Sequence, residues 1–226
     1  MIEYISAHNI DDRVLSRAVR ILQEGGLLAM PTDASWTIAC SLRAKEGIRK
    51  LRALSGERDE RHFTLLCSAI SQIGEYCSVD NTRFRLLKRL TPGPYVFVFK
   101  ALLGTEKALD IKRKEVGVRI SDHPVPNALI NALGSPLYSI TAKRSMTEEG
   151  SGIEQYDEVL DGKDGLPAIP EEELFDGAWE LEAIPHLDLI LDSGEERPRL
   201  LSTVLDLLGD EVLCLRQGAG EWPTRG

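Results

Sequence analysis

The chain has 226 residues, 42% of them apolar, which is enough to bury one large core. Its 36 acidic and 27 basic residues give a net charge of −9, which argues against a broad nucleic-acid-wrapping surface but permits a local basic site. Apolar runs such as 26–30 are far shorter than the roughly 20 residues that span a bilayer, so we expect no membrane association.

The hydrophobic pattern alternates between helix and strand periods along the whole chain. Apolar spacings of three and four predict helices, and short β-rich runs bounded by turn residues predict strands. In chain order, the predicted elements are a helix at 9–24, strands at 27–30 and 36–41, a helix at 44–54, a strand at 63–67, a helix at 81–90, strands at 95–99 and 116–120, a helix at 124–133, and strands at 137–141, 187–191, 203–208 and 212–215. The pattern predicts an α/β fold.

Helix ends are marked by capping residues. We expect Asn9 or Asp11 to cap the first helix, Asn81 to cap the basic helix, and Gly134 to end the helix at 124–133. Residues 147–182 are acidic and rich in Gly and Pro, so we expect mostly a surface excursion with one short helix at about 171–178. The chain is therefore predicted to be a single domain, 1–226, with an acidic surface insertion at about 147–182.

The cysteines and histidines show no metal or disulfide pattern. Cys40, Cys67, Cys77 and Cys214 lack any CxxC pairing, and buried structural thiols are the better interpretation. The histidines at 62, 123 and 186 have no metal-ligand spacing, so no metal site is predicted. The N-terminus lacks the basic and apolar regions of a secretion signal, which predicts a cytoplasmic protein.

Polar and basic residues follow the ends of four predicted strands. They are Thr32-Asp33, Ser121 to His123, Thr141 to Arg144, and Arg216. Taken alone, Thr32-Asp33 has a simpler explanation as a turn, Arg119 as a salt-bridged strand residue and Arg216 as a solvated end. Ligands in α/β folds gather at strand ends, and no GxxxxGK[ST] or GxGxxG cradle is present. The sequence thus predicts a phosphate-binding or nucleotide-binding site built from separate segments.

Five sets of segments follow one another in a recognisable order and spacing. They are Pro31-Thr32-Asp33 with Ile38-Ala39-Cys40, 91–95, 116–120 with His123-Pro124, 136–141, and 202–206 with 215–219. In this order and spacing they resemble the YrdC/YciO family of threonylcarbamoyl-adenylate synthase-like proteins, and the resemblance covers about residues 9 to 220, apart from the acidic insertion. Residues 61–67 and the lack of a lysine-x-arginine pair make the chain more similar to the YciO branch.

The resemblance implies a three-layer fold in which a twisted mixed sheet of about seven strands is flanked by helices and forms a concave basic cleft. It also implies an enzyme that joins L-threonine, bicarbonate and ATP into threonylcarbamoyl-adenylate and releases pyrophosphate. That product serves the t6A modification of tRNA, so tRNA-modification proteins are implied partners. Magnesium is expected with ATP, because cations must stabilise charge on the phosphoryl oxygens.

Carried over residue by residue, the resemblance assigns roles to eight positions. The substrate-binding positions are Thr32, Arg119, Thr141 and Ser202; the nucleotide-binding positions are Ser139 and Arg216; and the catalytic positions are Arg52 and Lys143. Hydroxyl groups at Ser139 and Thr141 can donate to phosphate oxygens. These assignments are what the resemblance implies.

Two positions depart from the family's pattern. The lysine-x-arginine motif falls near Arg52-Ala53-Leu54, so Leu54 stands where a second cation is expected, unless Arg58 or Arg61 replaces it. Lys143 stands where the family has the asparagine of its serine-x-asparagine motif. Losing a charge-stabilising donor costs about 10² to 10³ in rate, so we expect weak synthase activity.

Two other functions stay open from the sequence. One is double-stranded RNA binding by the same basic face, and the other is nucleotide binding without turnover.

Overall fold

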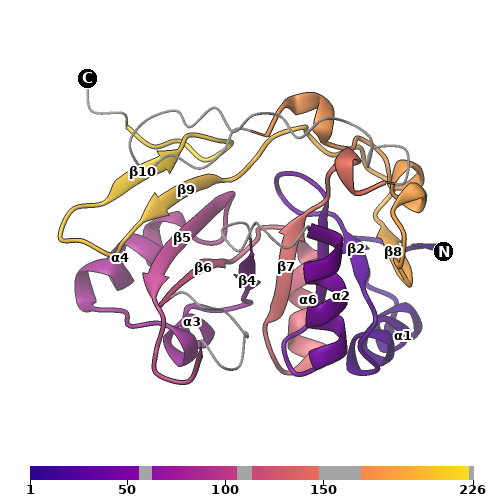
Figure 1. Ribbon diagram of the computed structural model, residues 1–226, viewed down its shortest axis with the longest axis horizontal. Helices are drawn as coiled ribbons and strands as arrows, with labels where there is room; N and C mark the ends of the chain where they lie inside the picture. The colour runs from indigo at the N-terminus through magenta and orange to yellow at the C-terminus, as the bar shows by residue number, and fades with distance from the viewer. Residues whose placement is uncertain (56–62, 106–113, 148–168, 224–226) are drawn as a thin grey trace.

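The computed structural model describes residues 1–55, 63–105, 114–147 and 169–223, and its described strands form a single twisted sheet (Figure 1). Along the sheet the strand order is β1-β8-β2-β3-β7-β4-β6-β5-β9-β10. The strands are β1 (Ile2–Tyr4), β2 (Leu28–Met30), β3 (Thr37–Ser41), β4 (Thr64–Leu66), β5 (Tyr95–Lys100), β6 (Glu115–Arg119), β7 (Leu137–Thr141), β8 (Leu189–Asp192), β9 (Thr203–Asp206) and β10 (Leu213–Arg216).

The sheet is mixed, as predicted, but it has ten strands and the expected number of about seven was too low. Four pairs are parallel: β1 with β8, β2 with β8, β4 with β6, and β5 with β9. The chain returns to this sheet near its C-terminal end, where β8 inserts beside β2 while β9 and β10 extend the other edge. The three-residue strand β1 is too short to show an alternating pattern, and its pairing with β8 forms the opposite edge.

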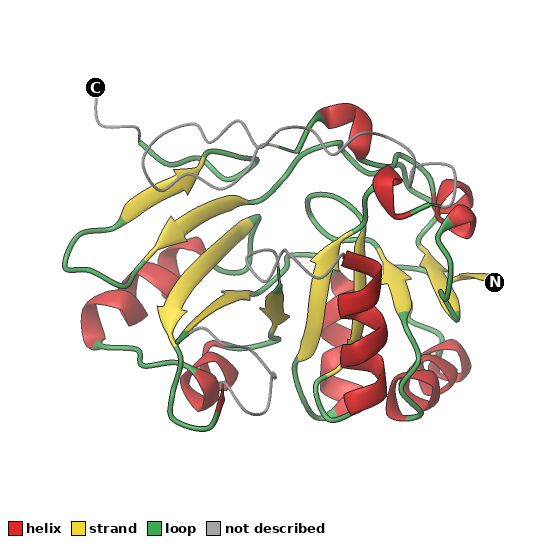
Figure 2. Cartoon of the chain, viewed as in Figure 1, coloured by secondary structure: helices red, strands yellow, loops and turns green. Residues whose placement is uncertain are grey.

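Helices cover both faces of the sheet (Figure 2). The α-helices are α1 (Asp12–Gln23), α2 (Lys45–Ser55), α3 (Ile70–Tyr76), α4 (Asn81–Leu90) and α6 (Pro124–Leu133), and the short 3-10 helices are η2 (Arg144–Met146), η4 (Glu171–Glu173) and η5 (Ala178–Ala183). α1 and α6 pack in one apolar cluster with β2, whereas α2, α3 and α4 contribute to a second cluster. None of the helices in the described ranges is both long and apolar enough to cross a bilayer.

The helix caps agree with the sequence at two of three positions. Asp11 caps α1, because its carboxylate accepts the backbone N–H groups of Arg13 and Val14. Gly134 ends α6 in the left-handed region, with φ of 69°, which glycine adopts without a Cβ penalty. The cap assigned to Asn81 was wrong: Asp80 caps α4, and Asn81 is already helical. The side chain of Asp80 accepts the backbone N–H of Arg83, one of the first-turn N–H groups that have no partner within the helix.

Successive side chains of a strand point to opposite faces of the sheet, so the buried apolar residues form two separate clusters. The larger one lies under α2 and includes Trp36, Tyr138 and Phe97, all buried. The other lies under α1 and α6 and includes Met30 and Leu137. Burial of apolar side chains against both faces supplies the main favourable free energy of folding. The cysteines at positions 40, 67 and 77 are buried, as predicted, but the prediction was wrong for Cys214, which is only partly buried on β10. Burial raises the pKa of Cys40 and of Cys77 to about 12.

Part of the acidic segment 147–182 packs into the core. Residues 148–168 lie outside the described residues, but Leu174, Phe175 and Leu181 are buried in the part that follows. The indole nitrogen of Trp36 donates to the carbonyl oxygen of Asp176 at 3.1 Å. Two 3-10 helices, η4 and η5, occupy the region where one short helix was expected. This stretch therefore covers one edge of the larger apolar cluster.

Candidate functional site

The loop between β2 and β3 holds Thr32 in a self-contained turn. The Thr32 hydroxyl donates to the carbonyl oxygen of Ser35 at 2.6 Å and accepts the backbone N–H of Ala34 at 3.1 Å. Thr32 is fully buried. The turn residues that end the apolar strand thus fold back on themselves, which is the usual local behaviour of threonine in a tight turn. This turn fixes the position of the next residue, Asp33.

Asp33 forms a buried ion pair with Arg119. The Arg119 Nη2 lies 2.6 Å from Asp33 Oδ1, and the two side chains are only 9% and 14% exposed. The same nitrogen is 3.4 Å from the Thr32 hydroxyl oxygen. Arg119 ends β6, where its neighbour Val118 points into the larger core, so strand alternation turns Arg119 to the other face. Burial lowers the pKa of Arg119, and Asp33 opposes that shift.

Ser121 and His123 connect this pair to the start of α6. The Ser121 hydroxyl hydrogen-bonds Asp33 Oδ1, and it accepts the backbone N–H of His123 at 3.2 Å. His123 is the N-cap of α6, and its Nδ1 accepts the backbone N–H of Val125 at 3.3 Å. Burial and the charge of Arg197 lower the pKa of His123 to about 4. The imidazole is therefore neutral near pH 7, with its proton on Nε2.

Two further arginines lie at the same site. Arg197 donates through Nη1 to the carbonyl oxygen of Thr32 at 3.3 Å. Arg216, the last residue of β10, donates from Nε and Nη2 to the carbonyl oxygen of Ser202 at 3.1 and 3.0 Å. Burial, together with the charge of Arg119, lowers the pKa of Arg216 to about 10. Three cations from distant segments are thus held near one another, an arrangement that favours an anionic ligand.

Buried polar atoms without a hydrogen-bond partner concentrate in this cluster. Such atoms are rare in folded proteins, because leaving one unpaired costs about 1–3 kcal/mol. Those of the cluster are Asp33 Oδ2, Arg119 Nε, His123 Nε2 and Arg197 Nε. The set contains N–H donors and one carboxylate acceptor. It is therefore suited to a ligand that carries both an anionic group and a hydrogen-bond donor.

Of the eight predicted site residues, Thr32, Arg119, Ser202 and Arg216 gather around this cluster. Ser139 lies on β7, where its hydroxyl donates to the carbonyl oxygen of Thr64 at 2.9 Å.

The remaining three predicted residues lie at element ends. Thr141 is the last residue of β7, paired with Thr37 of β3. Lys143 follows it, directly before η2. Arg52 is in the last turn of α2, the helix on the larger core. The candidate substitutes Arg58 and Arg61 lie outside the described residues.

Four residues of the cluster received no role from the family resemblance. Asp33, Ser121 and His123 were nevertheless among the strand-end residues at which the sequence predicted a site. Arg197 had no such signal, because it lies in an irregular loop after β8.

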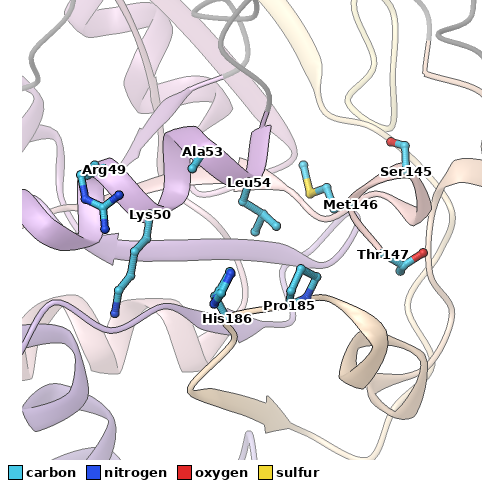
Figure 3. Close-up of a pocket in the computed structure, with 9 residues that line it drawn as sticks. All are labelled: Arg49, Lys50, Ala53, Leu54, Ser145, Met146, Thr147, Pro185 and His186. Atoms are coloured by element: carbon cyan, nitrogen blue, oxygen red, sulfur yellow. The ribbon is translucent and has the colours of Figure 1, made fainter. Parts of the chain in front are cut away.

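A separate hollow of about 630 Å³ lies beside α2 (Figure 3). It is lined by Arg49, Lys50, Ala53, Leu54, Ser145, Met146, Thr147, Pro185 and His186. Arg49 is exposed and already paired with Glu46 at 2.6 Å. The unpaired groups around Asp33 are buried instead, which makes that cluster the better candidate site. Within the described ranges, no three His, Cys, Asp or Glu side chains gather in a way that could hold a metal ion.

Comparison with known proteins agrees with the sequence-based resemblance. A family model described as Telomere recombination, and named for Sua5, YciO and YrdC, matches residues 20–165. The uncharacterised protein YciO of Escherichia coli is 32% identical over 224 residues, covering 96% of this chain and 95% of that protein. The threonylcarbamoyl-AMP synthase of Bos taurus is 28% identical over 199 residues, covering 85% of this chain and 63% of that enzyme.

Solved structures show the same fold. The crystal structure of Escherichia coli YciO matches with a TM-score of 0.73 and 28% identity, over 98% of this chain and 97% of that one. P. abyssi Sua5, complexed with L-threonine, matches with a TM-score of 0.76 and 18% identity, over 96% of this chain and 57% of that one. The chain therefore belongs to the Sua5/YciO/YrdC family, and it is more similar to YciO than to the bovine synthase.

Proposed function

We propose that this protein forms threonylcarbamoyl-adenylate from L-threonine, bicarbonate and ATP. The observation that carries the proposal is the set of buried, unpaired groups around Asp33. The N–H groups of Arg119 Nε and His123 Nε2 suit the carboxylate of a free amino acid, and Asp33 Oδ2 suits its ammonium group. The homologous synthase and the L-threonine complex of Sua5 support the choice of amino acid.

The reaction needs positive charge at the nucleotide. The amine of threonine condenses with bicarbonate to give a carbamate and water, a carbamate oxygen attacks the α-phosphate of ATP, and pyrophosphate leaves. Charge that develops on the phosphoryl oxygens must be met by fixed donors. In our proposal Arg216, Lys143 and Arg52 supply these donors, while Thr32, Thr141 and Ser202 help to hold the amino acid. Ser139 lines the nucleotide position as an acceptor, because its hydroxyl already donates to the carbonyl oxygen of Thr64. ATP enters as its magnesium complex, whose ion is held by phosphate oxygens.

Turnover is expected to be slow. Lys143 offers a point charge where the family has an amide that both donates and accepts. Leu54 leaves one expected cationic position without charge. Because one missing donor costs about 10² to 10³ in rate, and Lys143 can donate but cannot accept as the amide does, the protein should be a weak synthase that binds its substrates better than it converts them.

Buried arginines fit a small ligand better than an RNA duplex. The side chains of Arg119 and Arg197 are 9% and 10% exposed, so neither can follow a phosphate backbone across a surface. We therefore rank double-stranded RNA binding as the second candidate function, after the synthase activity. We also propose a cytosolic location, which accords with ATP as a substrate.

The test is direct detection of the product. The protein is incubated with ATP, magnesium, L-threonine and radiolabelled bicarbonate, and the acid-stable labelled adenylate and pyrophosphate are quantified. Both should appear in equal amounts, and both should vanish when threonine is omitted or when Arg119→Met replaces the wild type. Arg13→Met, which removes an arginine exposed on α1, should leave the yield unchanged. Equal yields from wild type and Arg119→Met would contradict the proposal.

A further inference from the structure

The loop between β8 and β9 brings Arg197 to the candidate site. Its side chain is 10% exposed, although loop arginines are usually solvated. The backbone N–H of Arg197 donates to the carbonyl oxygen of Asp176 at 3.1 Å, which holds the loop against the buried stretch before η5. Arg199, two residues on, differs: it is 32% exposed, and its Nε lies 2.7 Å from Asp176 Oδ1. One arginine of the loop is thus bound to the protein surface, and the other points inward.

The guanidinium of Arg197 is only partly used by the protein. Nη2 pairs with Glu195, whose side chain is 54% exposed, and Nη1 donates to the carbonyl oxygen of Thr32 at 3.3 Å. Nε is buried and has no partner. A guanidinium carries five N–H donors in a rigid fork, so a buried Nε–H marks the direction from which an acceptor is missing. This Nε belongs to the same guanidinium whose Nη1 contacts Thr32.

A second unpaired donor, on His123, lies near the guanidinium of Arg197. The Nδ1 of His123 accepts from Val125, so the ring proton is on Nε2, and this atom is buried without a partner. The pKa of His123 responds to the charge of Arg197, which requires the two side chains to be near each other. Arg119 adds a third unpaired N–H, on the residue that contacts both Thr32 and Asp33. Three donors on three segments therefore surround the Thr32-Asp33 turn.

The adjacent carboxylate of Asp33 decides which anion fits. Its Oδ2 is buried and unpaired, and it would repel the multiple negative charges of a polyphosphate. A zwitterion avoids this repulsion, because its ammonium group can approach Asp33 while its carboxylate approaches the arginines. The local charge pattern thus favours a free amino acid over a nucleotide.

We infer that Arg197 is a substrate-binding residue that, with His123 and Arg119, holds the carboxylate of the amino-acid substrate. This inference rests on the proposed function and adds to it a residue that the family resemblance did not assign. It predicts that the protein distinguishes an amino acid from its amide through Arg197. Arg199 takes no part in this recognition.

Calorimetric titration tests the assignment. L-threonine and L-threoninamide, which lacks the carboxylate, are titrated into the wild type, Arg197→Met, Arg197→Lys and the control Arg199→Met. Loss of one charge-assisted hydrogen bond should weaken L-threonine binding at least tenfold in Arg197→Met. Arg197→Lys should bind L-threonine with an affinity between those of the wild type and Arg197→Met, because lysine keeps the positive charge but lacks the forked guanidinium. Arg199→Met should match the wild type.

The amide separates recognition from general damage to the fold. Arg197→Met should leave L-threoninamide binding unchanged, so the preference for the acid over the amide should shrink. An unchanged affinity for L-threonine, or an equal loss for both ligands, overturns the inference. So does a wild type that binds L-threonine no better than L-threoninamide. If binding depends on Arg197 but no adenylate forms, the proposed function fails alone; if Arg197→Met makes adenylate with the wild-type KM for threonine, only this inference fails.

Discussion

Arg119 and Asp33 lie 86 positions apart in the chain, yet their side chains form a buried ion pair of 2.6 Å at the centre of the candidate site. The pair joins the end of β6 to the turn after β2. It leaves one atom of each partner unpaired, Arg119 Nε and Asp33 Oδ2. The pair therefore both fastens two distant segments and presents a donor and an acceptor to a ligand.

The first prediction concerns the stability of this pair. Asp33→Asn removes the negative charge and leaves Arg119 buried without its counter-ion, so unfolding free energy should fall by about 3 kcal/mol. Arg119→Met in the Asp33→Asn background removes the stranded charge, and the double variant should be more stable than Asp33→Asn alone. Urea denaturation of the wild type, both single variants and the double variant measures the coupling. Strictly additive effects would show that the two side chains do not depend on each other.

The second prediction concerns pH. His123 has a folded-state pKa of about 4, below its ordinary value of about 6.5, because of burial first and Arg197 second, while Glu195 and Asp33 oppose the shift. Between these values the unfolded chain binds a proton that the folded chain does not. Stability is therefore lost as pH falls from about 6.5 towards 4.

His123→Asn isolates this effect, because asparagine retains an oxygen that can cap α6 but does not titrate. Between about pH 7.5 and pH 5 the wild type should lose roughly 2 kcal/mol more unfolding free energy than His123→Asn. Chemical denaturation at both pH values gives the comparison. Parallel losses in the two proteins would mean that His123 is readily protonated in the folded state.

The third prediction uses two glycines. A Cβ added at Gly218 would lie 2.2 Å from the carbonyl oxygen of Leu201 and 2.7 Å from that of Ser202, the acceptor for Arg216. Gly218→Ala should therefore cost about 1–3 kcal/mol through backbone displacement. Gly74 lies inside α3 with nothing within 4 Å of the same added atom, so Gly74→Ala should stabilise by roughly 0.5–1 kcal/mol. Thermal unfolding should shift in opposite directions, and equal shifts would contradict the close approach at Gly218.

The fourth prediction separates binding from turnover. If Lys143 stabilises charge on the phosphoryl group, Lys143→Ala should lower the rate of adenylate formation by about 10² to 10³ while L-threonine affinity stays unchanged. Lys45→Ala, at the exposed start of α2, provides the matched control and should keep the wild-type rate. A rate for Lys143→Ala within twofold of the control would remove Lys143 from the reaction.

Local signals predicted most of the fold. The helices α1 and α6 have regular apolar spacing and clear terminal residues, and both were found close to the expected bounds. The missed elements, β1 and α3, have three and seven residues, too few for a period to show. The number of strands depends on which segments pair, and this is decided by long-range packing rather than by local sequence.

The candidate site was only partly predictable for the same reason. Thr32, Arg119 and Arg216 stand at strand ends, where position alone favours a role. Arg197 reaches the carbonyl oxygen of Thr32 across 165 positions from a loop without periodicity. No local pattern in the sequence indicates that contact, because it depends on how the loop packs against the stretch before η5.

The most direct test of the central claim is a crystal structure of the protein soaked with L-threonine. We predict density for the amino acid at the Asp33 cluster, with its carboxylate within hydrogen-bond reach of Arg119 and Arg197 and its ammonium group near Asp33 Oδ2. Density at the hollow beside α2, with the Asp33 cluster empty, would contradict the account.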